Sequence, residues 1–143
     1  MADFRNQQDR VQHDLAELMQ RPDEQINLAE AALVIAASAY PNLDAPHYLR
    51  RLDAMAETVA GRVSGETDPF RIIAHINQFL FQEEGFFGNT QEYYDLRNSF
   101  LNEVLDRKVG IPITLSTVYL DIAERLRFPL VGVGMPGHFL VKH

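Results

Sequence analysis

Thr114 and Ser116 are the residues through which this 143-residue chain could offer a nucleophile. They follow Pro112, and because proline suits the first turn of a helix, both hydroxyls are expected near a helix N-terminus. A hydroxyl so placed attacks an acyl group when a neighbouring base activates it. Ser and Thr in helices also bond to nearby backbone, and the spacing favours this structural role over catalysis.

A set of polar residues surrounds the same stretch and forms the predicted ligand-binding site. Asn98 and Asn102 are four residues apart and are expected on one helix face. Arg107 offers a fork of donors for a carboxylate or a carbonyl, and Tyr119 follows in the next helix. The alternative, held equally open, is that the polar set satisfies buried backbone groups around the turn at Gly110.

Composition excludes several kinds of function. The chain has no cysteine, so it forms neither a disulfide nor a thiolate metal site. No two histidines have the spacing of a zinc motif, and neither a metal nor a cofactor is predicted. Thirteen basic and twenty acidic residues give a net charge of -7, which argues against nucleic-acid binding. The first residues lack an apolar segment, and the longest apolar stretch, 28–40, is too short for a membrane span; a cytoplasmic protein is expected.

Hydrophobic spacing predicts helices through most of the chain, followed by two strands. Asp23 is expected to cap the second helix, and Asp68 with Pro69 to begin the fourth. The expected helices cover 8–20, 23–39, 46–63, 69–85, 98–107 and 112–126. The β-branched runs 130–134 and 139–141, joined by a turn at 135–137, predict an antiparallel hairpin.

Aromatic and histidine side chains are interpreted mainly as structural. Large rings near the loop at 85–90 are predicted to pack in the core rather than to flank a cleft; they are Phe86, Phe87, Tyr93 and Tyr94. His75 shares a face with apolar residues and is expected in the core. His13 and His47 have charged neighbours and are expected at the surface.

Residues 28–143 resemble a bacterial branch of the transglutaminase-like superfamily. The segments that carry the resemblance are Tyr40-Pro41-Asn42-Leu43-Asp44, Phe86-Phe87-Gly88-Asn89, Tyr93-Tyr94, Asn98, Leu101-Asn102, Val104-Leu105, Arg107, Gly110-Ile111-Pro112 and Pro136-Gly137-His138-Phe139-Leu140. The resemblance implies an α+β fold, in which helix-rich residues 1–107 pack on a truncated, papain-like core of a helix and a hairpin over 108–143. The sequence has no internal repeat, low-complexity segment or linker, so one domain over 1–143 is expected. In the branch that it resembles, tetratricopeptide-like repeats usually follow. Because the chain ends within a predicted strand, we expect a fragment of a longer protein.

The same resemblance indicates which positions of this chain correspond to the catalytic residues of the thiol enzymes. At the position of the nucleophile, this chain has no Cys. Thiol enzymes of this superfamily carry a Cys at the start of the core helix, and matching the two ends of that helix puts Pro112 there. His138 falls at the position of the catalytic base. Arg127 stands where the family's closing turn usually has Gly. Proline supplies no nucleophile and no donor.

A non-catalytic binding or regulatory module is therefore the predicted function, with a peptide or protein held in a degenerate cleft. Its own C-terminal repeats are a candidate partner. The alternative is a hydrolase or acyltransferase in which His138 activates Thr114, Ser116 or a water molecule.

Overall fold

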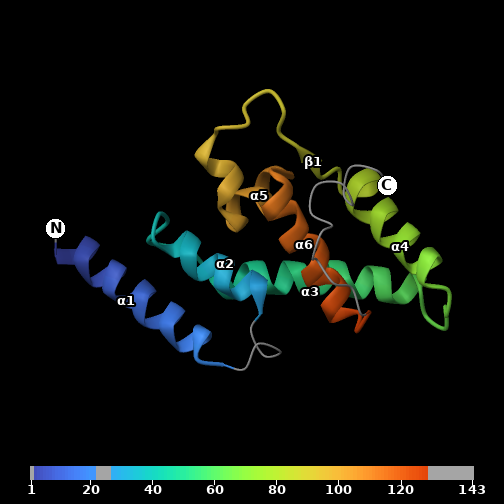
Figure 1. The fold of residues 1–143 in the computed structure, drawn as a ribbon, viewed down its shortest axis with the longest axis horizontal. Coiled ribbons are helices and arrows are strands. Elements are labelled where there is room, and N and C mark those ends of the chain that lie inside the picture. The colour runs from blue at the N-terminus through green and yellow to red at the C-terminus, as the bar shows by residue number, and fades with distance from the viewer. Residues whose placement is uncertain (1, 22–26, 129–143) are drawn as a thin grey trace.

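Helices make up most of the protein, as the computed structural model, which describes residues 2–21 and 27–128, shows (Figure 1). The order along the chain is α1 (Ala2–Met19), α2 (Leu28–Ala37), α3 (Ala45–Arg62), α4 (Pro69–Asn77), the π-helix η2 (Gln78–Glu83), β1 (Phe87–Gly88), the 3-10 helix η3 (Leu96–Ser99), α5 (Leu101–Arg107), β2 (Val109–Gly110) and α6 (Pro112–Arg125). The predicted helix-rich character is confirmed.

Helix α6 lies at the centre of the packing. It crosses α3 and also contacts α2, α4 and α5, whereas α1 lies along α2 (Figure 1). Val118 and Ile122 of α6 are fully buried in a cluster that includes Leu52 and Val59 of α3 and Leu33 of α2. Burying one such side chain contributes about 1.5–3 kcal/mol. Since α6 packs against four other helices, its buried face is held in place, whereas Ile113 of its first turn is 68% exposed.

Helices α3, α4 and α6 begin within one residue of the predicted positions, whereas α1, α2 and α5 begin elsewhere. Asp44 accepts a hydrogen bond from the His47 amide at 3.2 Å, and Asp68 accepts one from the Phe70 amide at 3.0 Å. Each bond satisfies one of the free amides at a helix N-terminus. Helix α2 begins later than predicted because it is capped by Asn27 rather than by Asp23: the Asn27 side chain accepts from the Glu30 amide at 2.7 Å.

The sheet of the described residues is parallel, so the predicted short antiparallel sheet is wrong for this part of the chain. Phe87 pairs with Val109 and Gly88 with Gly110. The Phe87 amide donates to the Lys108 carbonyl at 3.1 Å, and the Asn89 amide donates to the Gly110 carbonyl at 2.9 Å. A two-residue strand has no alternation for a sequence pattern to reveal. The predicted hairpin over 130–141 lies outside the described residues.

The prediction that the four rings near the loop pack in the core is correct for only one of them. Phe86 is buried beneath the Lys108 ammonium, which lies 4.9 Å from its ring centre. Phe87, Tyr93 and Tyr94 are exposed, and the two tyrosines contact each other edge to face. Of the histidines, His75 is half-buried, and His13 and His47 are exposed as predicted.

Candidate functional site

The start of α6 is a tightly packed turn. Gly110 has no room for a side chain: a Cβ there would lie 2.8 Å from Thr114 Oγ1 and 3.1 Å from Val104 Cγ1. Pro112, at the position that the resemblance assigns to the nucleophile, is exposed and begins the helix. Thr114, one of the two predicted candidate nucleophiles, therefore lies directly beneath the turn.

The Thr114 hydroxyl is fully used in backbone hydrogen bonds. It accepts from the Ile111 amide at 3.1 Å, and it lies 2.8 Å from the Asn98 carbonyl oxygen and 3.1 Å from the Ile111 carbonyl oxygen. A hydroxyl has one hydrogen to donate, so these two carbonyls share it. Thr114 thereby caps the helix start and ties it to η3.

Ser116 lies one turn further along and differs from Thr114. Its Oγ is shielded from solvent, and no hydrogen bond from the described part of the chain reaches it. Local bonding to the backbone, predicted for both hydroxyls, therefore applies to Thr114 and not to Ser116. His138 lies outside the described residues, and its pairing with either hydroxyl stays a prediction.

Asn98 organises the loop before α5. Its side-chain nitrogen donates to the carbonyls of Glu92 at 2.9 Å and Tyr93 at 3.1 Å, and its Oδ1 accepts from the Asn89 side chain at 3.1 Å. The side chain is completely buried. Both the nitrogen and the oxygen of the Asn98 side chain form hydrogen bonds within its own loop. This geometry agrees with the alternative in which the polar residues satisfy buried backbone groups, although these groups belong to the loop at 89–93 rather than to the turn at Gly110.

Asn98 and Asn102 do not share a helix face, contrary to the prediction. Asn98 belongs to η3, and Asn102 to α5, and the extended backbone of Phe100 separates the two elements. The 3.6-residue spacing rule therefore does not apply between them. Asn102 is 5% exposed, and its Oδ1 accepts no hydrogen bond among the described residues.

Arg107 contacts Asp95, and Tyr119 contacts Phe81. Arg107 Nη2 lies 3.8 Å from Asp95 Oδ2, and Arg107 Nη1 is buried without a partner in the part of the chain that the structure describes. Hydrogen bonds from the Arg97 side chain and amide lower the pKa of Asp95 to about 2, and Arg107 adds to the effect. Tyr119 stacks on Phe81 with ring centres 6.2 Å apart, and burial raises the pKa of its phenol.

One groove lies where the turn between α2 and α3 meets α5; we call it the Tyr40 groove. It has a volume of about 500 Å³, and its walls include Tyr40, Asp44, Tyr48, Asn102, Glu103 and Asp106. Two phenols are tied to carboxylates there: Tyr40 donates to Glu103 at 3.2 Å, and Tyr48 donates to Asp106 at 2.8 Å. Of its lining residues, only Asn102 was predicted as a site residue; the others come together because α5 packs on the α2–α3 turn.

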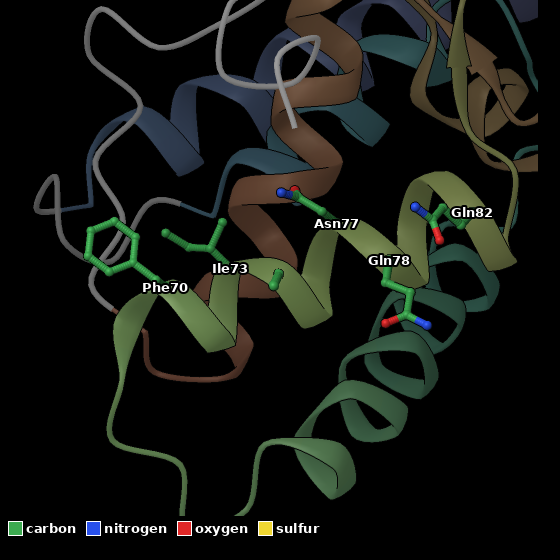
Figure 2. Close-up of a pocket in the computed structure, with 6 residues that line it drawn as sticks. Phe70, Ile73, Asn77, Gln78 and Gln82 are labelled. Atoms are coloured by element: carbon green, nitrogen blue, oxygen red, sulfur yellow. The ribbon is translucent and has the colours of Figure 1, made fainter.

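A second groove of about 410 Å³ runs along α4 (Figure 2). Ile73 and Asn77 project from the same side of the helix, and Phe70, near the start of α4, is 81% exposed. Asn77 Oδ1 is buried and accepts no hydrogen bond among the described residues. The groove continues onto the π-helix, where Gln78 and Gln82 line it, and a π-helix is a rare geometry that often accompanies a functional site.

The comparisons identify the family. The transglutaminase-like superfamily model matches residues 46–143, and the chain belongs to that superfamily. It is 41% identical over 124 residues to a UPF0162 protein of Xylella fastidiosa strain Temecula1, which covers 84% of this chain and 43% of the relative. A UPF0162 protein of Vibrio cholerae is 34% identical over 120 residues, covering 82% of this chain and 43% of the relative. Human F-box only protein 21 is 27% identical over 157 residues, covering 94% of this chain and 25% of that protein.

The chain spans less than half the length of these UPF0162 relatives. No solved structure matches the chain.

The described residues contain neither a cluster of metal-ligating side chains nor a helix that could span a membrane. Nowhere in 2–21 and 27–128 do three or more metal-ligating side chains gather into a cluster. No helix in these ranges is both long and apolar enough to cross a membrane.

Proposed function

We propose that this protein is a non-catalytic member of the superfamily that holds a peptide or protein partner. The observation that carries the proposal is which residues stand at the N-terminus of α6 and how their hydroxyl groups are bonded. The position that the resemblance assigns to the family's nucleophile holds Pro112, in a chain with no cysteine. The nearest hydroxyl of the helix, Thr114, is already engaged by three backbone groups.

The bonding of Thr114 argues against catalysis on energetic grounds. To attack an acyl group, the hydroxyl would have to leave the Ile111 amide and the Asn98 carbonyl without a partner. Leaving one buried backbone group unpaired costs about 1–3 kcal/mol. The same groups would have to be restored after each turnover, so the geometry favours a permanent structural role.

The alternative function depends on Ser116. Its Oγ is free of hydrogen bonds from the described residues, and a base placed beside it would make a nucleophile. The alternative is a hydrolase or acyltransferase in which His138 supplies that base. Against it, Ser116 Oγ is closed off from solvent.

The test is an assay for turnover with the full chain. Hydrolysis of p-nitrophenyl acetate and of a fluorescent casein digest would be measured for the wild type and for Ser116→Ala and His138→Ala. We expect rates at the buffer background for all three. Turnover by the wild type that both substitutions abolish would overturn the proposal in favour of the hydrolase.

The partner is part of the same proposal. The UPF0162 relatives extend well beyond the matched region, and tetratricopeptide-like repeats of the longer protein are one candidate to contact this domain. A separate peptide or protein is the other. Mixing this chain with the remainder of a full-length relative and measuring association by light scattering distinguishes the two: association supports the intramolecular partner.

A further inference from the structure

The groove along α4 has an apolar half that lies open at the surface. Phe70 is 81% exposed, Ile73 is half-buried, and Ala74 beside them is exposed (Figure 2). All three side chains line the groove. Apolar side chains that gather beside a groove, unlike single exposed ones, are typical of a contact surface. The first half of α4 is therefore a candidate for covering by another stretch of polypeptide.

The other half of the same groove is polar but uncharged. The exposed side chains of Gln78 and Gln82 line it, and none of the six residues around the groove carries a charge. A carboxamide both donates and accepts hydrogen bonds, so it matches the peptide group, which does the same. The groove therefore suits an extended, uncharged stretch of polypeptide with apolar side chains, and it offers an ionic ligand no partner.

The chain itself contains a stretch of this kind after the described residues. Residues 129–141 include no Asp, Glu, Lys or Arg, and the β-branched run 130–134 is the first of the two predicted strands. The family model matches residues 46–143, so α4 and this run belong to the same domain. Since a domain buries its apolar strands against its own helices or sheets, the run needs a packing surface within this domain.

The path of the chain brings this run toward the groove. Helix α6 contacts α4 and crosses behind it in Figure 2. Phe128, the last described residue, follows the end of α6 closely and packs against the core cluster. A five-residue strand that starts two residues later spans about 17 Å. The stretch from Phe70 to Gln82 rises roughly 16–18 Å along the helix axis, so the two lengths match.

We propose that residues 130–134 of this chain dock in the α4 groove as an extended strand, with Val131 and Val133 against its apolar half. Alternate residues of a strand point to opposite faces, so the two valines share a face and lie about 7 Å apart. Successive turns of the helix are about 5.4 Å apart, which is close to this spacing. The opposite face of the strand carries only Leu130 and two glycines, so the valine face is the one to bury. This contact does not depend on the proposed function, which rests on the N-terminus of α6.

Engineered cysteine pairs test the contact, because the natural chain has no cysteine to interfere. The full chain carries Ala74→Cys with either Val131→Cys or Val133→Cys, and oxidised glutathione starts disulfide formation. Ala16→Cys with the same partners is the matched control, since Ala16 is an exposed alanine of α1, which lies along α2. Non-reducing gels should show at least one α4 pair that closes within the chain about tenfold faster or more than its control. Equal rates in test and control, or no bond in either α4 pair, would overturn the inference.

Amide hydrogen exchange measures the same contact without new cysteines. We expect the amides of residues 130–134 to exchange more slowly than those of an unstructured chain, and Phe70→Ala to speed their exchange about three- to tenfold. Leu96→Ala is the matched control, because it removes an apolar side chain that is 75% exposed but lies in η3, outside the groove. It should leave the exchange of 130–134 unchanged. An equal effect of the two variants would contradict docking in this groove.

The other candidate occupants of the groove give different results. A disulfide between two chains, seen as a dimer that increases with protein concentration, would assign the groove to a second copy and overturn the inference. Unprotected amides at 130–134 in the wild type would leave the groove to a separate protein, with the same consequence. The turnover assay with Ser116→Ala and His138→Ala reads the N-terminus of α6, so failure of the proposed function is distinguishable from failure of this contact.

Discussion

The Thr114 hydroxyl donates to the backbone carbonyl oxygen of Asn98 across 2.8 Å, which joins the first turn of α6 to the 3-10 turn sixteen residues earlier. Asn98 in turn holds the carbonyls of Glu92 and Tyr93 through its side chain. One hydroxyl thus connects the central helix with the loop that leads into α5. A hydroxyl considered as a possible nucleophile is thus a link between two elements of the fold.

Replacing Thr114 by valine keeps its shape and removes these hydrogen bonds. The Ile111 amide and the Asn98 carbonyl would lose a buried partner, so we expect the free energy of unfolding to fall by roughly 1–3 kcal/mol. Urea denaturation followed by circular dichroism measures the change. Thr117→Val is the matched control, because its hydroxyl donates only to the Ile113 carbonyl of the same helix at 2.9 Å. Its effect should stay within about 0.5 kcal/mol, and an equal loss in both variants would contradict the special role of Thr114.

Gly110→Ala tests the close packing beneath the same turn. The new methyl group would meet Thr114 Oγ1 at 2.8 Å and Val104 Cγ1 at 3.1 Å, so the helix start must shift. We expect a loss of about 1–3 kcal/mol in the free energy of unfolding. Gly61→Ala, in α3, adds a methyl group that meets nothing within 4 Å. It should instead raise stability by roughly 0.5–1 kcal/mol; if both variants lost stability to the same extent, crowding at Gly110 would not be the cause.

The acid stability of the protein should depend on Asp95. Its pKa is lowered from 3.8 to about 2 in the folded state by Arg97 and Arg107. A lowered pKa means that the carboxylate stabilises the folded protein at all pH values above about 4, and that this contribution disappears as the pH falls through about 2. Asp95→Asn keeps an acceptor for the Arg97 amide but removes the charge.

The measurement is the difference in unfolding free energy between the wild type and Asp95→Asn at several pH values. We expect the wild type to be the more stable at pH 6 and the difference to shrink below about pH 4. Glu57→Gln, at an exposed position of α3, serves as the comparison. A wild-type advantage that is the same at about pH 2.5 as at pH 6 would exclude the ion pair as its source.

Sequence predicted the parts of the fold that depend on local chemistry. The starts of α4 and α6 were found because Asp68-Pro69 and Pro112 act on their own first turns. The start of α2 was missed because Asp23 and Asn27 are both competent caps. The Asn27 amide also lies 3.4 Å from Asp121 Oδ1, a partner 94 residues away that no local pattern reveals.

The candidate site likewise has features that local sequence predicts and features that depend on long-range packing. Thr114 was found from its place near a helix start, but its bond to Asn98 depends on where η3 packs. The Tyr40 groove was missed because Tyr40 and Glu103, whose side chains are 3.2 Å apart, are separated by 63 residues. Helical spacing misled the pairing of Asn98 with Asn102, since a 3-10 turn and an extended residue interrupt the helix between them.

Arg127 gives the last prediction, because its backbone adopts a conformation that favours glycine. Its φ angle is +58°, in the left-handed region, directly after α6. The Phe128 amide donates to the Ala123 carbonyl at 2.9 Å and the Arg127 amide to the Glu124 carbonyl at 2.9 Å, which is the Schellman pattern of helix ends. An L-residue with a Cβ is strained in this conformation by about 1–2 kcal/mol.

Arg127→Gly should therefore stabilise the protein, even though it removes an exposed side chain. Relief of the strain outweighs the greater freedom of glycine in the unfolded chain, and we expect a net gain of about 0.5–1 kcal/mol in the free energy of unfolding. Arg127→Ala is the control, because it removes the same charge but keeps the Cβ, and it should give no comparable gain. Equal stabilisation by glycine and alanine would point to the loss of the arginine charge, and the backbone explanation would then be wrong.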